Sequence, residues 1–127
     1  SLDLRAPNDA QRDALAADVL EQLQQIAARR GVRYTLEETM RASAAPSAPA
    51  WQQRWEAAVE SLGLPVFRMP SGAGHDAMKL HEVMPQAMLF VRGENAGISH
   101  NPLESTNAED MELAVRAMQH LLHGLAG

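Results

Sequence analysis

Apolar side chains recur every three or four residues over a long stretch near the start of the chain. They are Leu15, Val19, Leu23 and Ile26. This spacing predicts an amphipathic helix from about Asp9 to Arg30. Asn8 and Gln11 resemble a capping box at its start, and Gly31 follows its last apolar turn.

Three further helices are predicted, two of them from the same helical period of apolar residues. The first has an apolar stripe that ends before Gly63 and consists of Trp51, Trp55, Ala58, Val59 and Leu62. The segment Asp76 to Val83 predicts a short helix. Thr106 and Glu109 form a second possible capping box before a final helix. The stripe of that helix is Met111, Val115, Met118, Leu122 and Leu125.

Extended segments are predicted between these helices. Residues 2–5 and 32–37 alternate apolar and polar side chains, as half-buried strands do, and residues 66–67 could be a short extended piece. The run Ala87 to Val91 is wholly apolar, which is typical of a parallel strand covered on both faces. Because strands would alternate with helices, we expect an α/β or α+β fold. The loop Ala42 to Ala50 is the best candidate for a domain boundary.

Composition narrows the class of protein. The chain has 127 residues, of which 46% are hydrophobic and 4% aromatic, so we expect a thin core of close-packed, alanine-rich helices. The absence of cysteine excludes a disulfide scaffold and thiolate catalysis. A net charge of −5 argues against nucleic acid and membrane surfaces as partners, and we expect a cytoplasmic protein. Because the chain opens inside a strand pattern without Met, we expect the natural chain to be longer.

The candidate chemistry lies in two loops, residues 71–77 and 97–106. Each follows an extended segment and leads into a helix, which is where open α/β sheets bind ligands. The first loop also matches a short dinucleotide fingerprint, but Asp76 would place a carboxylate where the pyrophosphate must lie. A triad of Ser71, His75 and Asp76 is disfavoured because one tight turn cannot align all three. Ser71 is better interpreted as shaping the loop.

Two readings of the loop histidines stay open at this level. His75 and His100, with Asp76 and Glu104 nearby in sequence, carry donor atoms that suit a cation such as zinc. Equally, both histidines could simply bond to loop backbone, because a zinc site needs three or four ligands and this spacing is not a standard one. His120 and His123 on the final helix are interpreted as a solvated face.

Taken together, the two loops resemble the hydantoinase/carbamoylase amidohydrolases of the zinc aminoacylase and carboxypeptidase superfamily. The resemblance is carried by Ser-Gly-Ala-Gly-His-Asp-Ala at residues 71–77 and by Gly-Ile-Ser-His-Asn-Pro-x-Glu-x-Thr at residues 97–106. Family members include N-carbamoyl-L-amino-acid hydrolases, beta-ureidopropionases and allantoate amidohydrolases. They are longer proteins in which a lid domain that also mediates dimerisation interrupts a zinc-dependent catalytic domain.

The resemblance implies a division of this chain. Residues 1–41 would be the second half of an α+β, ferredoxin-like lid and dimerisation domain. Residues 42–127 would be the C-terminal part of the zinc-peptidase-like catalytic domain. The implied protein is a homodimer that hydrolyses linear C–N bonds of small ureido, carbamoyl or amide substrates, such as N-carbamoyl amino acids or allantoate.

The resemblance also implies roles for particular residues. His100 would be a ligand of zinc, or of manganese, cobalt or nickel, and the remaining ligands would lie in a missing N-terminal part of the chain. His75, with Gly74, would hold the substrate oxygen on which charge develops. Arg5 would clamp the substrate carboxylate. The residues expected to support the loops from behind these groups are Asp76, Asn101 and Glu104.

With one ligand of the several that zinc requires, the 127-residue piece alone is predicted to be inactive. The alternative hypothesis is a stand-alone, non-catalytic interaction module. Such a module would use the stripe of Leu15, Val19 and Leu23 for self-association, and its histidine loops would have no catalytic task.

Overall fold

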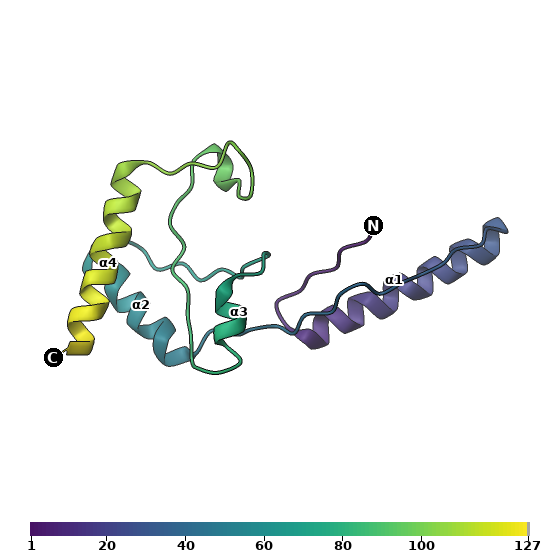
Figure 1. The fold of residues 1–127 in the computed structure, drawn as a ribbon, viewed down its shortest axis with the longest axis horizontal. Helices are drawn as coiled ribbons and strands as arrows, with labels where there is room; N and C mark the ends of the chain where they lie inside the picture. The colour runs from purple at the N-terminus through teal and green to yellow at the C-terminus, as the bar shows by residue number, and fades with distance from the viewer. Residues whose placement is uncertain (127) are drawn as a thin grey trace. The chain divides into compact units, whose positions relative to one another are not determined.

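The computed structural model describes residues 1–126, which form helices joined by extended segments and loops. In chain order the elements are α1 (Asp9–Arg30), α2 (Pro49–Ser61), α3 (Asp76–Leu80), the 3-10 turn η1 (Asn95–Gly97) and α4 (Ala108–Ala126), as Figure 1 shows. No helix in this part of the chain is long and apolar enough to cross a membrane.

The predicted α/β class is wrong, because residues 1–126 contain no β-strand and therefore neither a sheet nor a ferredoxin-like lid. A strand forms only where backbone N–H and C=O groups pair with a neighbouring segment. The alternation of apolar and polar residues determines which side chains would share a face of a strand, but it does not provide a second segment for the backbone to pair with. Accordingly Val32 and Leu36 are each 54% exposed, and Phe90 and Val91, expected to be covered on both faces, are each 44% exposed.

The boundaries predicted for α1 are confirmed. The Asn8 side chain caps the first turn, because its Oδ1 accepts a hydrogen bond from the backbone N–H of Gln11 at 2.9 Å. At the other end Gly31 adopts the left-handed conformation, with φ of 63°, and the next residue, Val32, donates its N–H to the Ala27 carbonyl at 3.1 Å. This is the Schellman arrangement, which favours glycine at the turn.

The chain divides into two compact units, and the first consists of residues 1–46 and 69–79. Within it, the segment after α1 folds back along the helix (Figure 1). Arg12 donates to the Ala42 carbonyl, and Asp9 Oδ1 accepts the Ala44 N–H at 2.9 Å. Side chains at the start of α1 therefore hold the far end of the returning segment.

The second unit consists of residues 47–68 and the described residues from 80 onward, and its core lies between α2 and α4. Ala58 of α2 is completely buried, and Ala117 and Leu121 of α4 are 2% and 7% exposed. Because alanine side chains are small, the two helices can approach closely, as Figure 1 shows. The partly buried side chains around this contact are Trp51, Trp55, Leu62 and Leu89.

The apolar stripe predicted for the last helix is not the face that packs. All five of its residues, Met111, Val115, Met118, Leu122 and Leu125, are between 43% and 56% exposed. Ala117 and Leu121, four residues apart, face the core instead. The predicted Thr106–Glu109 box is also replaced, since Asn107 Oδ1 accepts the Asp110 N–H at 2.8 Å. The third helix ends at Leu80, earlier than predicted.

Replacing Ala58 by Leu is expected to lower the free energy of unfolding by about 1–3 kcal/mol, because the larger side chain would enter a contact without free space. Denaturant unfolding followed by circular dichroism measures the change. The matched control is Ala57→Leu at the exposed neighbouring position, for which we expect a change within about 0.5 kcal/mol. Equal loss in both variants would contradict the packing described here.

Candidate functional site

Ser71 shapes the first candidate loop, residues 71–77. Its hydroxyl donates to the Ala73 carbonyl at 2.8 Å, and its Oγ accepts the Ala73 N–H at 3.2 Å. The same Oγ lies 3.0 Å from Nε2 of His75. When the single hydroxyl proton is directed at the Ala73 carbonyl, the contact with Ser71 is satisfied by the tautomer of His75 that carries a proton on Nε2. The loop therefore accommodates a histidine that can donate a hydrogen bond from Nε2.

Arg5 is held against this loop. Its Nε and Nη2 donate to the two carboxylate oxygens of Asp3 at 3.0 and 2.6 Å, and its Nη1 donates to the Gly72 carbonyl. These three bonds leave two of the five guanidinium N–H groups for another acceptor. The hydrogen bonds from Arg5 lower the pKa of the Asp3 carboxyl, because they stabilise its charged form.

The end of the first loop is set by the start of α3. The His75 carbonyl accepts the Met78 N–H at 2.9 Å, and Asp76 is the first helical residue, where the helix dipole favours a negative charge. A Cβ added at Gly74 would lie 3.2 Å from Sδ of Met78. Glycine at this position therefore leaves room for the Met78 side chain beside the loop.

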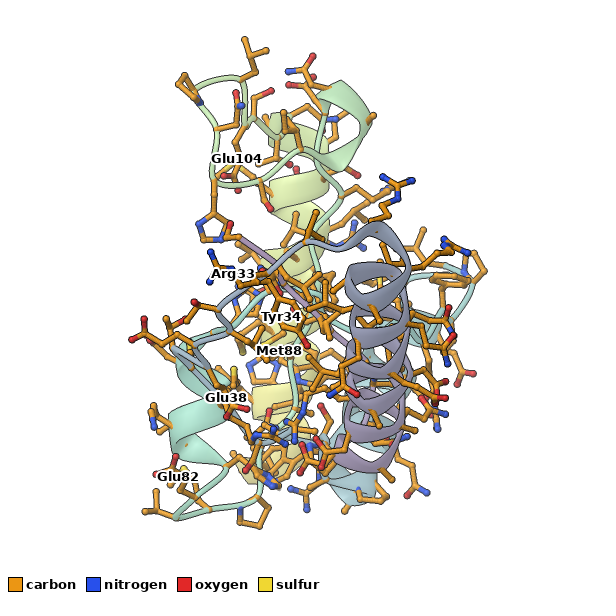
Figure 2. The ribbon with its side chains drawn as sticks, turned by 90° about the vertical axis from the view of Figure 1, so that its right-hand side faces the viewer. Arg33, Tyr34, Glu38, Glu82, Met88 and Glu104 are labelled. Carbon is orange, nitrogen blue, oxygen red and sulfur yellow. The ribbon has the colours of Figure 1, made fainter. Side chains whose placement is uncertain are left out.

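The second candidate loop holds His100 in a left-handed conformation, with φ of 55°. Oε2 of Glu104 accepts the His100 backbone N–H at 2.8 Å, and Glu104 can be found in Figure 2. The Glu104 N–H donates to the Asn101 carbonyl at 2.9 Å, and Asn101 Oδ1 accepts the Leu103 N–H at 3.0 Å. Asn101 and Glu104 thus hold the backbone around His100, whose side chain is exposed.

Two further pairs across this loop were missed by the sequence analysis. Ser105 Oγ donates to Glu94 Oε2 at 2.6 Å, and Asn95 Nδ2 donates to the Leu103 carbonyl at 2.8 Å. These partners are eight to eleven residues apart in sequence and follow no helical or strand period. The signal that could have pointed to them is the clustering of polar side chains on both flanks of the Gly-Ile-Ser-His stretch.

The candidate residues fall into two sets, one in each unit. Arg5, Gly74, His75 and Asp76 belong to the first unit, and the 100–104 loop belongs to the second. Within residues 1–126, no three His, Asp or Glu side chains come together as a metal site requires. The imidazole of His100 suits a metal as one donor, but the residues described do not make a complete site.

Comparison with known proteins matches the chain to one family and to amidohydrolases. The model of the peptidase family M20/M25/M40 matches residues 7–124. Over 125 residues the chain is 34% identical to an N-carbamoyl-L-amino acid amidohydrolase of Geobacillus stearothermophilus, covering 98% of this chain and 30% of that protein. Over 127 residues it is 34% identical to an allantoate amidohydrolase of Bacillus subtilis (strain 168), covering 99% of this chain and 30% of that protein.

A third relative is more similar over a shorter stretch. An allantoate amidohydrolase of Escherichia coli (strain K12) is 45% identical over 58 residues, which is 46% of this chain and 14% of that protein. The chain thus spans about 30% of the length of the two amidohydrolases that it matches almost from end to end.

Removing Arg5 is expected to return the Asp3 carboxyl to its ordinary pKa of 3.8, because Arg5 is the main cause of the lower value in the native chain. Carbon-13 NMR titration of the Asp3 carboxyl in the native chain and in Arg5→Ala measures the change. Arg33→Ala, which removes an exposed arginine elsewhere in the same unit, is the control and should leave the titration as it is. An Asp3 titration that does not respond to Arg5→Ala would refute the pairing.

Proposed function

The chain belongs to the peptidase family M20/M25/M40, which confirms the resemblance to carbamoylases and allantoate amidohydrolases, and on this premise we propose an amidohydrolase function for the whole protein. Its reaction would be hydrolysis of a linear C–N bond in a small ureido, carbamoyl or amide substrate. The observation that carries the proposal is the hydrogen bond from Arg5 to Gly72. It holds an anion-binding guanidinium against the loop that carries His75, whose Nε2 bonds to Ser71 and would exchange this partner for a substrate oxygen.

The first loop would bind the two ends of an N-carbamoyl amino acid or a similar substrate. The N–H groups that Arg5 has left fit a carboxylate, which guanidinium binds with charge-assisted hydrogen bonds. His75 would act as the catalytic residue of this chain. When water adds to the scissile carbonyl, negative charge develops on its oxygen, and a preorganised N–H donor stabilises that charge. Gly74 would let the substrate approach the backbone beside His75.

The second loop would contribute one metal ligand. The family is metal-dependent, and a divalent ion such as zinc, manganese, cobalt or nickel would polarise the carbonyl group or activate water when bound. His100 is the residue of this chain that we assign to it, with the other ligands outside the described residues. Asn101 and Glu104 would support His100 through the backbone, and Asp76 would support the loop of His75.

The division of the protein remains part of the same proposal. Residues 1–41 would belong to the lid and dimerisation domain and residues 42–127 to the catalytic domain of a cytoplasmic homodimer. The partial exposure of the α1 stripe favours self-association through this helix, since Leu15 and Ile26 are 41% and 39% exposed while Val19 and Leu23 are half-buried. The same observation supports the second candidate function, a non-catalytic interaction module, which predicts association without hydrolysis or metal.

In the full-length protein, His100→Ala is expected to weaken zinc binding by about 100-fold or more and to abolish hydrolysis of carbamoyl or allantoate-like substrates, because a direct ligand is lost. Zinc content after dialysis and the hydrolysis rate measure the two effects. His120→Ala, an exposed histidine on α4, is the control and should keep both. A native full-length protein without metal or hydrolysis would instead support the interaction module.

Arg5→Lys in the full-length protein is expected to raise KM for a carboxylate-bearing substrate about tenfold, because the ammonium group lacks the planar fork that holds a carboxylate. The value of kcat should change little, since the group acts at the unreactive end of the substrate. Steady-state kinetics measures both constants, with Arg33→Lys as the matched variant. If Arg5→Lys left KM unaltered, Arg5 would not be the carboxylate clamp.

A further inference from the structure

The loop that carries His100 is closed at its base by a reciprocal pair of residues. The Glu94 backbone N–H donates to the Ser105 carbonyl at 2.8 Å, and the Ser105 hydroxyl returns a bond to Glu94 Oε2 at 2.6 Å. A hydroxyl bound to a carboxylate makes a short, charge-assisted hydrogen bond, which is stronger than a neutral one. Both backbone and side chain of the two residues are therefore used to hold the two flanks of the loop together.

This base is anchored to the helix that follows it. Arg92 forms an ion pair with Asp110 at 2.6 Å, and the Asp110 side chain is only 15% exposed. The Thr106 hydroxyl donates to the Arg92 carbonyl at 2.7 Å. Since Asp110 lies in the first turn of α4, the start of the loop is fixed to the same helix that packs against α2.

Directly after Glu94, the chain turns through three consecutive residues with left-handed backbone conformations. Asn95, Ala96 and Gly97 have φ values of 51°, 61° and 69°. Asn95 also bonds across the loop, through Nδ2, to the Leu103 carbonyl at 2.8 Å. A left-handed backbone is unfavourable for residues other than glycine, so such a turn persists only where other bonds hold it. The Glu94–Ser105 pair and the Asn95 bond hold this turn, together with the Gly97 N–H, which donates to the Glu94 carbonyl at 2.9 Å.

His100 lies beyond this turn and depends on it in the same way. Its own backbone is left-handed, and the Glu104 carboxylate that accepts its N–H is the residue next to Ser105. Because Glu104 and Ser105 are adjacent, the bond from Ser105 to Glu94 also fixes the backbone from which Glu104 reaches the His100 N–H. The Glu94–Ser105 pair thereby positions the backbone of residues 100–104, which directs the His100 imidazole.

We propose that Glu94 and Ser105 are positioning residues for His100, which set the direction of its imidazole by fixing the base of the loop. The inference rests on the proposed function, in which His100 is a metal ligand. Neither residue reaches the imidazole, so the pair acts through the backbone of residues 100–104.

The test uses the full-length protein with Glu94→Ala, Ser105→Ala and the double variant. We expect the zinc dissociation constant, measured by competition with a chelator, to rise about tenfold in each single variant. The double variant should be no weaker than either single one, because both remove the same bond. Hydrogen exchange at the His100 and Glu104 amides, which donate to the Glu104 carboxylate and the Asn101 carbonyl, should become about tenfold faster in all three, since the side-chain bond that holds the base of the loop is lost.

The conservative variant separates positioning from charge. Glu94→Gln keeps an oxygen that accepts the Ser105 hydroxyl, so it should restore most of the zinc affinity lost in Glu94→Ala. Glu112→Ala, an exposed glutamate on α4, is the matched control and should retain native values. If Glu94→Ala fails to fold, Ser105→Ala, which removes only a hydroxyl, decides the question by the same measurements.

The outcomes distinguish this inference from the proposed function. Native zinc affinity and native exchange in Glu94→Ala or Ser105→Ala, together with loss of zinc in His100→Ala, would overturn the positioning role and leave the metal ligand in place. Native zinc affinity in His100→Ala would overturn the proposed ligand itself. A loss of zinc in Glu94→Ala without faster exchange at the His100 amide would also refute the positioning role, since zinc affinity would then depend on the charge of Glu94 and not on the loop backbone.

Discussion

The contact between Ala58 and Ala117 is the constraint on which the second unit depends. Two helices can pack this closely only where both present a small side chain, and these two alanines are almost completely buried. Once α4 is placed on α2, its first turn supplies Asp110 as the anchor of Arg92. From this anchor, hydrogen bonds of Thr106, Ser105 and Glu104 hold successive parts of the loop of His100. The packing of the Ala58 and Ala117 side chains therefore fixes the helix to which the loop of His100 is anchored.

The first unit is held together in a different way. Its ordered contacts are mainly bonds from charged side chains to backbone or to one another, such as Asp9 to the Ala44 N–H and Arg5 to the Gly72 carbonyl. Exposed bonds of this kind contribute little stability individually, because water competes for the same groups. They are directional, however, and here they place a guanidinium beside a histidine. The charged residues of this unit therefore serve mainly to orient its segments and contribute little to its stability.

The parts of the fold that could be predicted are those set by neighbours in sequence. The ends of α1 follow from Asn8 and Gly31, which act within one turn, and both were predicted correctly. The strands failed because pairing depends on a distant segment, and Val32 to Glu37 has none. For α4 the stripe of apolar residues predicted a helix, but it did not reveal which face meets α2. The loops containing His75 and His100 were recognised from residue identity, whereas the Glu94–Ser105 pair depends on a turn that no local pattern encodes.

The left-handed backbone of His100 has a consequence for the evolution of this family. A φ of 55° is most readily adopted by glycine, and asparagine tolerates it at least as well as histidine does. Replacement by either residue would preserve the loop while deleting the imidazole that we propose as a metal ligand. Replacement by a β-branched residue would strain the turn itself. Position 100 therefore separates two kinds of sequence divergence, one that removes only the imidazole and one that disturbs the loop backbone.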